Sequence, residues 1–157
     1  MNDIDLHCHS TASDGALSPF ELIQRADRLA VHTVAITDHD TTNGVSEALQ
    51  AGAELRLEVI PGVEINTDMP GSELHVLGYF VDHTNRAFTD ELQRLREGRI
   101  SRAKKMAEIL TSLGAPVRFE RILEVAGEGS VGRPHVAQVL LEAGHVASYN
   151  EAFQRFI

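Results

Sequence analysis

The chain has 157 residues, 43% of them hydrophobic, which suits one compact domain with a buried core. Its formal net charge of −9 argues against a surface that holds long duplex nucleic acid, although a local basic cluster can still bind a small phosphate. A single cysteine, Cys8, excludes a disulfide framework within the chain, and no apolar run approaches the ~18 residues of a membrane span. The acidic start lacks the basic segment of a signal peptide, so we expect a cytoplasmic protein.

The first predicted strand ends at the sequence His-Cys-His, residues 7–9, and the polar residues 10–15 follow as a loop. Ser18 then begins a helix that is expected to run to about residue 30. A serine is a good N-cap, Pro19 suits the first helical position, and Glu21 completes a capping box.

Three further strands are predicted at residues 33–37, 59–65 and 74–81, with a helix at 43–55 and a turn at 68–72. This order of strands and helices predicts an α/β fold with a largely parallel sheet covered by helices. In such folds the loops after the strands build the site, and polar side chains cluster there in this sequence.

From residue 85 onward the pattern is helical only. Residues 88–113 form a long amphipathic stretch closed by Gly114, and shorter helices are predicted at 119–126, 134–142 and 149–156. The apolar positions of the long stretch include Leu92, Leu95, Ile100, Ala103, Met106, Ile109 and Leu110. We therefore divide the chain into an α/β metal-binding part at 1–84 and an all-helical insertion at 85–157.

His7 and His9 lie two residues apart, so in an extended segment their imidazoles share one face. Such a pair can chelate one divalent cation or divide between two, although histidines also occur as hydrogen-bonded core or loop residues. Asp14, in the loop that follows, supplies a carboxylate that could reach the same centre. Taken alone, its Asp-Gly sequence is more often a turn.

His39 stands between Asp38 and Asp40 just beyond an apolar strand. A histidine flanked by carboxylates can be a metal ligand that a neighbouring acid orients. The alternative is that these residues only cap the next helix, and we expect Asp40 or Thr42 to be that cap in either case.

Glu64 is predicted to lie in a buried strand, where an unpaired carboxylate would be costly and therefore needs a cation or several donors. His75 is also predicted to lie in an apolar strand, where burial of its ring without a partner would be less costly, and a hydrogen-bonded core histidine is the alternative for it.

Imidazole and carboxylate ligands without thiolate suit Zn²⁺, Mn²⁺ or Fe²⁺. Two adjacent ions of this kind support hydrolysis of a phosphate ester. Cys8 points away from its neighbours and is expected in the core.

With these residues assembled, the sequence resembles the PHP family, named for polymerases and histidinol phosphatases. The likeness rests on three ordered motifs, which are His7-Cys8-His9-Ser10, Thr37-Asp38-His39-Asp40, and Pro61-Gly62-Val63-Glu64-Ile65 with His75 following. Within the family it is most similar to small bacterial phosphoesterases that carry Ser-Asp-Gly after the first motif and Gly132-Arg133-Pro134-His135 in a helical insertion.

The resemblance implies a distorted (β/α)₇ barrel that holds two or three divalent ions, with Mn²⁺ preferred and Zn²⁺ or Fe²⁺ as alternatives. It also implies hydrolysis of nucleoside 3′,5′-bisphosphates or trimming of short RNA 5′ ends. The implied ligands are His7, His9, Asp14, His39, Glu64 and His75, with Glu64 bridging two ions and Asp38 in the second shell. Arg133 and His135 would recognise a substrate phosphate, although Arg133-Pro134 also suits a plain helix start.

The sequence departs from the family pattern because nothing after Val81 resembles the later histidine and the C-terminal Asp-x-His of the barrel. We therefore expect an incomplete barrel, from a fragment, a truncated gene or a site completed by a second polypeptide, with weak metal binding and poor hydrolysis. Exposed strand edges would favour a homo-oligomer. The alternatives are a phosphatase of the histidinol phosphate type and a non-catalytic metal-binding or interaction domain.

Overall fold

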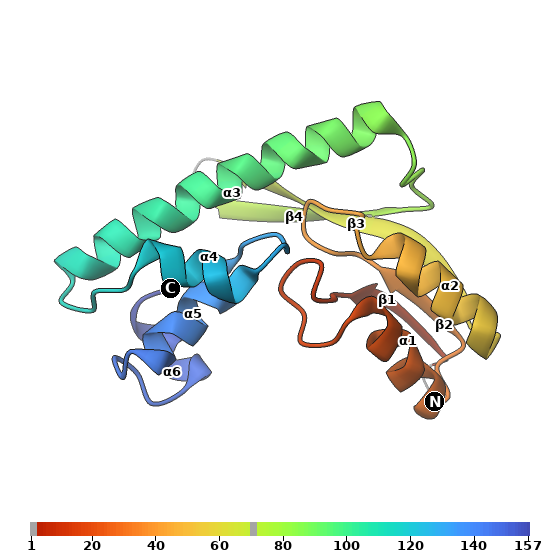
Figure 1. Ribbon diagram of the computed structural model, residues 1–157, viewed down its shortest axis with the longest axis horizontal. Helices are drawn as coiled ribbons and strands as arrows, with labels where there is room; N and C mark the ends of the chain where they lie inside the picture. Colours follow the sequence, from red (N-terminus) through yellow and green to blue (C-terminus); the bar gives the residue numbers. More distant parts are fainter. Residues whose placement is uncertain (1–2, 70–71) are drawn as a thin grey trace. The chain divides into compact units, whose positions relative to one another are not determined.

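The computed structural model describes residues 3–69 and 72–157 (Figure 1). They form two compact units, Met1–Leu95 and Arg96–Ile157, and each is considered by itself below. Helix α3 (Arg86–Ser112) runs through the boundary between them. The division of the chain at residues 84 and 85 stays a prediction.

The first unit is built on one sheet with the strand order β1-β2-β3-β4. Its elements are β1 (Ile4–Cys8), α1 (Pro19–Arg28), β2 (Thr33–Ile36), α2 (Val45–Leu55), β3 (Glu58–Met69) and β4 (Ser72–Tyr79). The pairs β1/β2 and β2/β3 are parallel, in agreement with the predicted largely parallel sheet, and β3/β4 is antiparallel.

The sheet is curled, so that its two edge strands approach each other. The Tyr79 hydroxyl on β4 donates a hydrogen bond to the Leu6 carbonyl on β1 at 3.0 Å, although two strands separate them in the sheet. A flat sheet with a strand spacing of about 4.8 Å would hold these strands roughly 14 Å apart. The curl brings side chains from all four strands toward one space.

Helices α1 and α2 lie side by side against one face of the sheet (Figure 1). Their shared core contains Ile23, Ala26, Val34, Ile36, Val45, Ala48, Ala51 and Leu57. Helix α1 begins as predicted, because the Ser18 hydroxyl accepts a hydrogen bond from the Glu21 N–H and the Glu21 carboxylate accepts one from the Ser18 N–H.

The predicted cap of α2 is wrong. Gly44 is the N-cap and makes no side-chain cap bond. Asp40 instead accepts a hydrogen bond from the Asn66 N–H, and the Thr41 hydroxyl accepts one from the Asn43 N–H. The carboxylate is therefore used to join the end of β2 to β3.

The predicted turn at 68–72 is shorter than expected, since Asp68 and Met69 belong to β3 and Ser72 begins β4. Pro70 and Gly71, which would form its centre, lie outside the described residues.

The second unit is all-helical, as predicted, with α4 (Phe119–Ala126), α5 (Arg133–Glu142) and α6 (Tyr149–Arg155) around the C-terminal part of α3. Helix α3 ends where Gly114 adopts a positive φ of 80°. The Ala115 N–H then bonds to the Leu110 carbonyl and the Gly114 N–H to the Thr111 carbonyl, which is a Schellman motif.

The amphipathic pattern of α3 predicted its buried positions only in part. Ala103 and Leu110 are buried in the core of the second unit and Leu92 is also buried, whereas Leu95 and Ile109 are exposed. None of the described helices is long and apolar enough to cross a membrane.

Candidate metal centre

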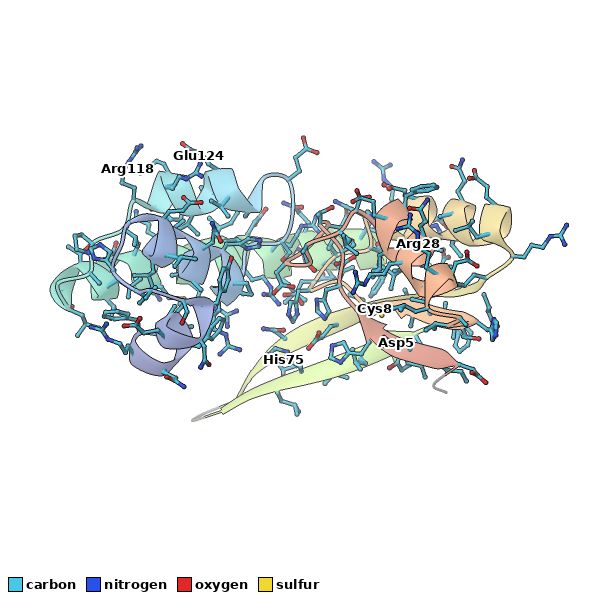
Figure 2. The ribbon with its side chains drawn as sticks, turned by 90° about the horizontal axis from the view of Figure 1, so that it is seen from below. Asp5, Cys8, Arg28, His75, Arg118 and Glu124 are labelled. Carbon is cyan, nitrogen blue, oxygen red and sulfur yellow. The ribbon has the colours of Figure 1, made fainter. Side chains whose placement is uncertain are left out.

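Four strands deliver imidazole and carboxylate groups to the space inside the curled sheet. His7 lies on β1 and His9 just after it, His39 follows β2, Glu64 lies on β3, and His75 lies on β4. Figure 2 labels His75 on its strand. The sixth candidate, Asp14, lies in the loop between β1 and α1. All six residues that the sequence singled out therefore gather in one place.

Glu64 is the centre of this group and is only 2% exposed. Its Oε2 lies 2.8 Å from Nε2 of His7 and 2.8 Å from Nε2 of His9. Its Oε1 contacts Nδ1 of His75, and Nδ1 of His39 lies 3.6 Å from Oε2. Burial alone would raise the pKa of Glu64, but the four imidazoles outweigh it and lower the pKa.

Asp14 lies on the other side of two of these rings. Its Oδ1 is 3.1 Å from Nδ1 of His9, and its Oδ2 is 3.6 Å from Nε2 of His39. Burial opposes protonation of His9, yet the hydrogen bond to Asp14 and the charges of Glu64 and Asp38 raise its pKa. His9 and His39 thus lie between two carboxylates.

The rings themselves are closely packed. Their centroids are 5.2 Å apart for His7 and His9, 4.5 Å for His9 and His39, and 5.3 Å for His39 and His75. Potential ligand atoms lie within 4.8 Å of one another in three groups, which are His7–His9–Glu64, His9–Asp14–His39 and His39–Glu64–His75. Four imidazoles this close would repel one another if all were protonated, so the arrangement favours a few divalent cations over many protons.

Asp38 does not join these groups. Its buried carboxylate accepts hydrogen bonds from the Ser10 N–H at 2.7 Å, the Ser10 hydroxyl at 2.7 Å and the Ser13 hydroxyl at 2.6 Å. Burial raises the pKa of Asp38, against the effect of these hydrogen bonds. The sequence identified Asp38 but missed the roles of Ser10 and Ser13, which only the fold brings to it.

Cys8 faces away from the centre, as expected. It packs against the core under α1 and α2 (Figure 2), and burial raises the pKa of its thiol to about 12. It remains a neutral thiol at ordinary pH and is no candidate ligand.

Arg133 and His135 belong to the second unit, where they form the first turn of α5. The Nδ1 atom of His135 accepts a hydrogen bond from the Gly132 N–H at 2.9 Å, so the neutral ring carries its proton on Nε2. Just before them, Ser130 is 1% exposed, and its hydroxyl has no hydrogen-bond partner among the described residues. No pattern in the sequence pointed to Ser130.

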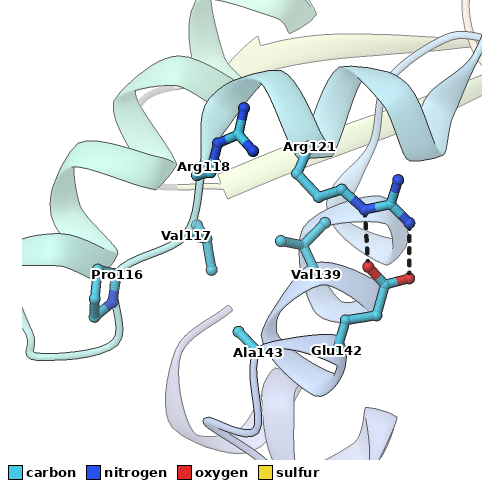
Figure 3. Close-up of a pocket in the computed structure, with 7 residues that line it drawn as sticks. All are labelled: Pro116, Val117, Arg118, Arg121, Val139, Glu142 and Ala143. Atoms are coloured by element: carbon cyan, nitrogen blue, oxygen red, sulfur yellow. Dashed lines mark hydrogen bonds and ion pairs between the residues drawn. The ribbon is translucent and has the colours of Figure 1, made fainter.

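The second unit also contains a cavity of about 240 Å³ (Figure 3). Pro116, Val117, Val139 and Ala143 supply its apolar lining. At its edge the Arg121 guanidinium binds the Glu142 carboxylate through two hydrogen bonds, of 2.9 and 3.3 Å. This pairing occupies both charged groups, and none of the six candidate ligands lines the cavity.

The curled α/β sheet and its imidazole–carboxylate cluster are the arrangement that a metal-dependent protein of the PHP class requires. The family model described as the PHP domain matches residues 5–154, and the chain belongs to this family. The predicted α/β fold with an incomplete barrel is confirmed by two solved structures, of which this chain covers about half.

Two of the curated relatives that match nearly the whole chain show its range of similarity. A 5′-3′ exoribonuclease of Haemophilus influenzae is 40% identical over 153 residues, which is 98% of this chain and 56% of the relative. A 3′,5′-nucleoside bisphosphate phosphatase of Chromobacterium violaceum is 34% identical over 158 residues, which is 100% of this chain and 55% of the relative. The chain thus spans about half the length of these relatives.

Two solved structures agree with this assignment. One is an amidohydrolase from Chromobacterium violaceum with bound sulfate and no metal, with a TM-score of 0.88, 34% identity, and coverage of 98% of this chain and 55% of the other. The other, from Bifidobacterium adolescentis, is described as a metal-dependent phosphoesterase, with a TM-score of 0.87, 34% identity, and coverage of 97% and 54%.

Proposed function

We propose that this protein is a metal-dependent phosphoesterase that hydrolyses a phosphate ester of a small nucleotide, either a nucleoside 3′,5′-bisphosphate or a short oligoribonucleotide. The observation that carries the proposal is the convergence of six imidazole and carboxylate residues into three overlapping groups around the buried Glu64. The names of the relatives supply the substrate class.

The ligands would be His7, His9, Asp14, His39, Glu64 and His75. Glu64 directs one oxygen toward His7 and His9 and the other toward His75, so each of its oxygens would be available to hold an ion. The donors are nitrogen and oxygen without thiolate, which fits Mn²⁺, Zn²⁺ or Fe²⁺, and we propose two or three ions with Mn²⁺ preferred. Bound divalent ions lower the pKa of a coordinated water and neutralise charge on a phosphoryl group.

The remaining chemistry falls to the chain's own side chains. Asp14 and Glu64 contact the two ring nitrogens of His9 at 3.1 and 2.8 Å and lie 3.6 Å from those of His39, so each ring is flanked by two carboxylates that restrict its orientation. The enclosed position of Glu64, at 2% exposure, keeps competing water from its oxygens.

We assign recognition of a substrate phosphate to the start of α5. Arg133 is its first residue, and His135 is oriented by Gly132 so that Nε2–H can donate. The buried Ser130 hydroxyl needs a partner, and a phosphate oxygen would satisfy it. The N-terminus of a helix also favours an anion.

The distribution of charge along the chain indicates that the first unit needs bound cations to accept an anionic substrate. Residues 1–95 carry 5 Lys and Arg against 16 Asp and Glu, a formal charge of −11, whereas residues 96–157 carry 9 against 7, a charge of +2. An anionic substrate would be repelled from the first unit unless divalent ions offset its carboxylates. We further propose that this activity is cytoplasmic and directed at small phosphorylated substrates.

The test is release of phosphate from adenosine 3′,5′-bisphosphate by protein stripped with a chelator and then supplied with Mn²⁺. Because the chain spans about half the length of its relatives, we expect weak activity that requires the metal and is lost in Glu64→Ala together with its metal content. Glu58→Ala, a change at an exposed carboxylate of the same strand, is the matched control and should retain both. Metal content that does not depend on Glu64 would contradict the proposal.

A further inference from the structure

We propose that Asp38 is a positioning residue that fixes the loop of residues 10–15 and thereby holds the Asp14 carboxylate against His9 and His39. The inference rests on the proposed metal-dependent function. It concerns one of the three ligand groups, His9–Asp14–His39. The position of Asp38 next to His39 in the sequence suggests that it orients His39, whereas we infer that it acts on the loop.

The hydrogen bonds of Asp38 point to the loop. The carboxylate is 1% exposed, and the three hydrogen bonds described above all come from Ser10 and Ser13. Hydrogen bonds to a buried carboxylate are stronger than those between neutral groups. Ser10 and Ser13 are themselves 0% and 2% exposed, so water does not compete for them.

The loop is closed around the same residue, Ser10. Its carbonyl accepts hydrogen bonds from the Ser13 N–H at 3.0 Å and the Gly15 N–H at 2.9 Å, and its hydroxyl accepts one from the Ala12 N–H at 3.1 Å. A Cβ at Gly15 would lie 2.2 Å from the His9 carbonyl oxygen, so the loop must return tightly over the end of β1. Asp14 lies between Ser13 and Gly15, and both of these neighbours are held.

Asp14 needs this support because it differs from the other five candidates. They lie on a strand or directly after one, so the sheet fixes them, whereas Asp14 lies well inside a connecting loop. Gly44 lies against the other side of Asp38, where a larger residue would crowd the carboxylate. A Cβ at Gly44 would lie 3.1 Å from Oδ2 of Asp38 and 3.0 Å from the Ser10 hydroxyl.

The experiment measures metal content by mass spectrometry and Co²⁺ absorption in the full chain, with Asp14→Asn as the reference for loss of one ligand. We expect Asp38→Ala to lose the same ion as Asp14→Asn, with roughly ten- to a hundredfold weaker binding of that ion and unchanged binding of the others. The double variant should bind no less metal than Asp14→Asn alone, because both changes act on one ion.

Asp38→Asn separates position from charge. Its amide oxygen can still accept the two hydrogen bonds to Oδ1, from the Ser10 N–H and the Ser13 hydroxyl, so it should retain the ion with at most about tenfold weaker binding. Equal losses in Asp38→Asn and Asp38→Ala would overturn the inference in favour of a charge effect. So would additive losses in the double variant.

Ser13→Ala provides an independent test if Asp38→Ala does not fold. It removes the hydrogen bond of the Ser13 hydroxyl to Asp38 together with the 3.4 Å contact of that hydroxyl with Nδ1 of His9, and we expect weaker binding of the same ion with the other ions unaffected. Wild-type binding of every ion in Ser13→Ala would refute the positioning role alone. Wild-type protein that binds no metal would overturn the proposed function as well, so the two failures are distinguishable.

Discussion

At the scale of single residues, the sequence predicted which residues form the candidate site better than it predicted the side chains that contact them. Glu64 was expected to need a cation or several donors because its strand is buried, and in the structure four imidazoles surround it. Asp38 was also identified, but its neighbours in the sequence gave no sign that Ser10 and Ser13 would donate to it. Such pairs are 25 to 28 residues apart in the chain, and only the adjacency of β1 and β2 brings them together.

Cys8 gives a residue-scale prediction. Because burial raises its pKa from 9.0 to about 12, the thiolate fraction near pH 8 should fall roughly a thousandfold on folding. In EDTA-treated protein, alkylation by iodoacetamide at pH 8 should therefore be at least a hundredfold slower in the native state than in guanidinium. Similar rates in the two states would contradict the buried position of Cys8.

The raised pKa of the Cys8 thiol also predicts how this residue affects the stability of the fold as pH changes. The thiol of the unfolded chain loses its proton first as pH rises past about 9, while the folded thiol keeps it. Cys8 therefore disfavours the folded state progressively above that pH. A comparison of wild type with Cys8→Ala between pH 8 and 10 isolates this contribution from that of other titrating groups.

At the scale of elements, local signals located the helices well where capping chemistry was explicit. The start of α1 followed from Ser18, Pro19 and Glu21, whereas α2 begins at a glycine cap because Asp40 bonds to β3 instead. Strand ends were less well determined, and β3 and β4 extend into the predicted turn. Pairing between strands stabilises residues whose local preference is for a turn.

Ser18→Ala tests the capping box. Loss of the hydroxyl leaves an N–H of the first turn of α1 without its partner, and we expect the free energy of unfolding to fall by about 1 kcal/mol. Urea denaturation followed by circular dichroism measures the change. Ser46→Ala, an exposed position in the first turn of α2 whose side chain does not cap that helix, is the matched control and should change stability by less than about 0.5 kcal/mol.

At the scale of the whole molecule, the chain consists of two units with different charge and different chemistry. The first carries the six candidate ligands and most of the acidic residues, and the second carries the basic excess with Arg133 and His135. The two edge strands of the sheet, β1 and β4, expose Ile4, Leu6, Leu74 and Val76. Association through these edges stays a prediction.

Removal of metal should affect the two units differently. Ions bound by the proposed ligands would stabilise the folded sheet, because ligands that bind only the native state shift its equilibrium. We expect chelation to increase hydrogen exchange in β1, β3, β4 and the loop 10–15, with little change in α4, α5 and α6. Mass spectrometry of exchange measures this, and Glu64→Ala should exchange like chelated wild type. An equal increase of hydrogen exchange in both units would contradict a metal centre that lies in the first unit alone.

The sequence by itself determined the order of elements, the class of fold, the helix starts with explicit caps and the identity of the six candidate ligands. These follow from local patterns: periodicity, capping residues and polar groups at the ends of apolar runs. The tertiary structure decided what depends on distant segments meeting, namely the curl that joins Tyr79 to Leu6, the contacts of Glu64 with four histidines, and the bonds of Asp38 to the loop. Contacts between residues far apart in the chain are set by how strands pair and bend, and no local pattern encodes them.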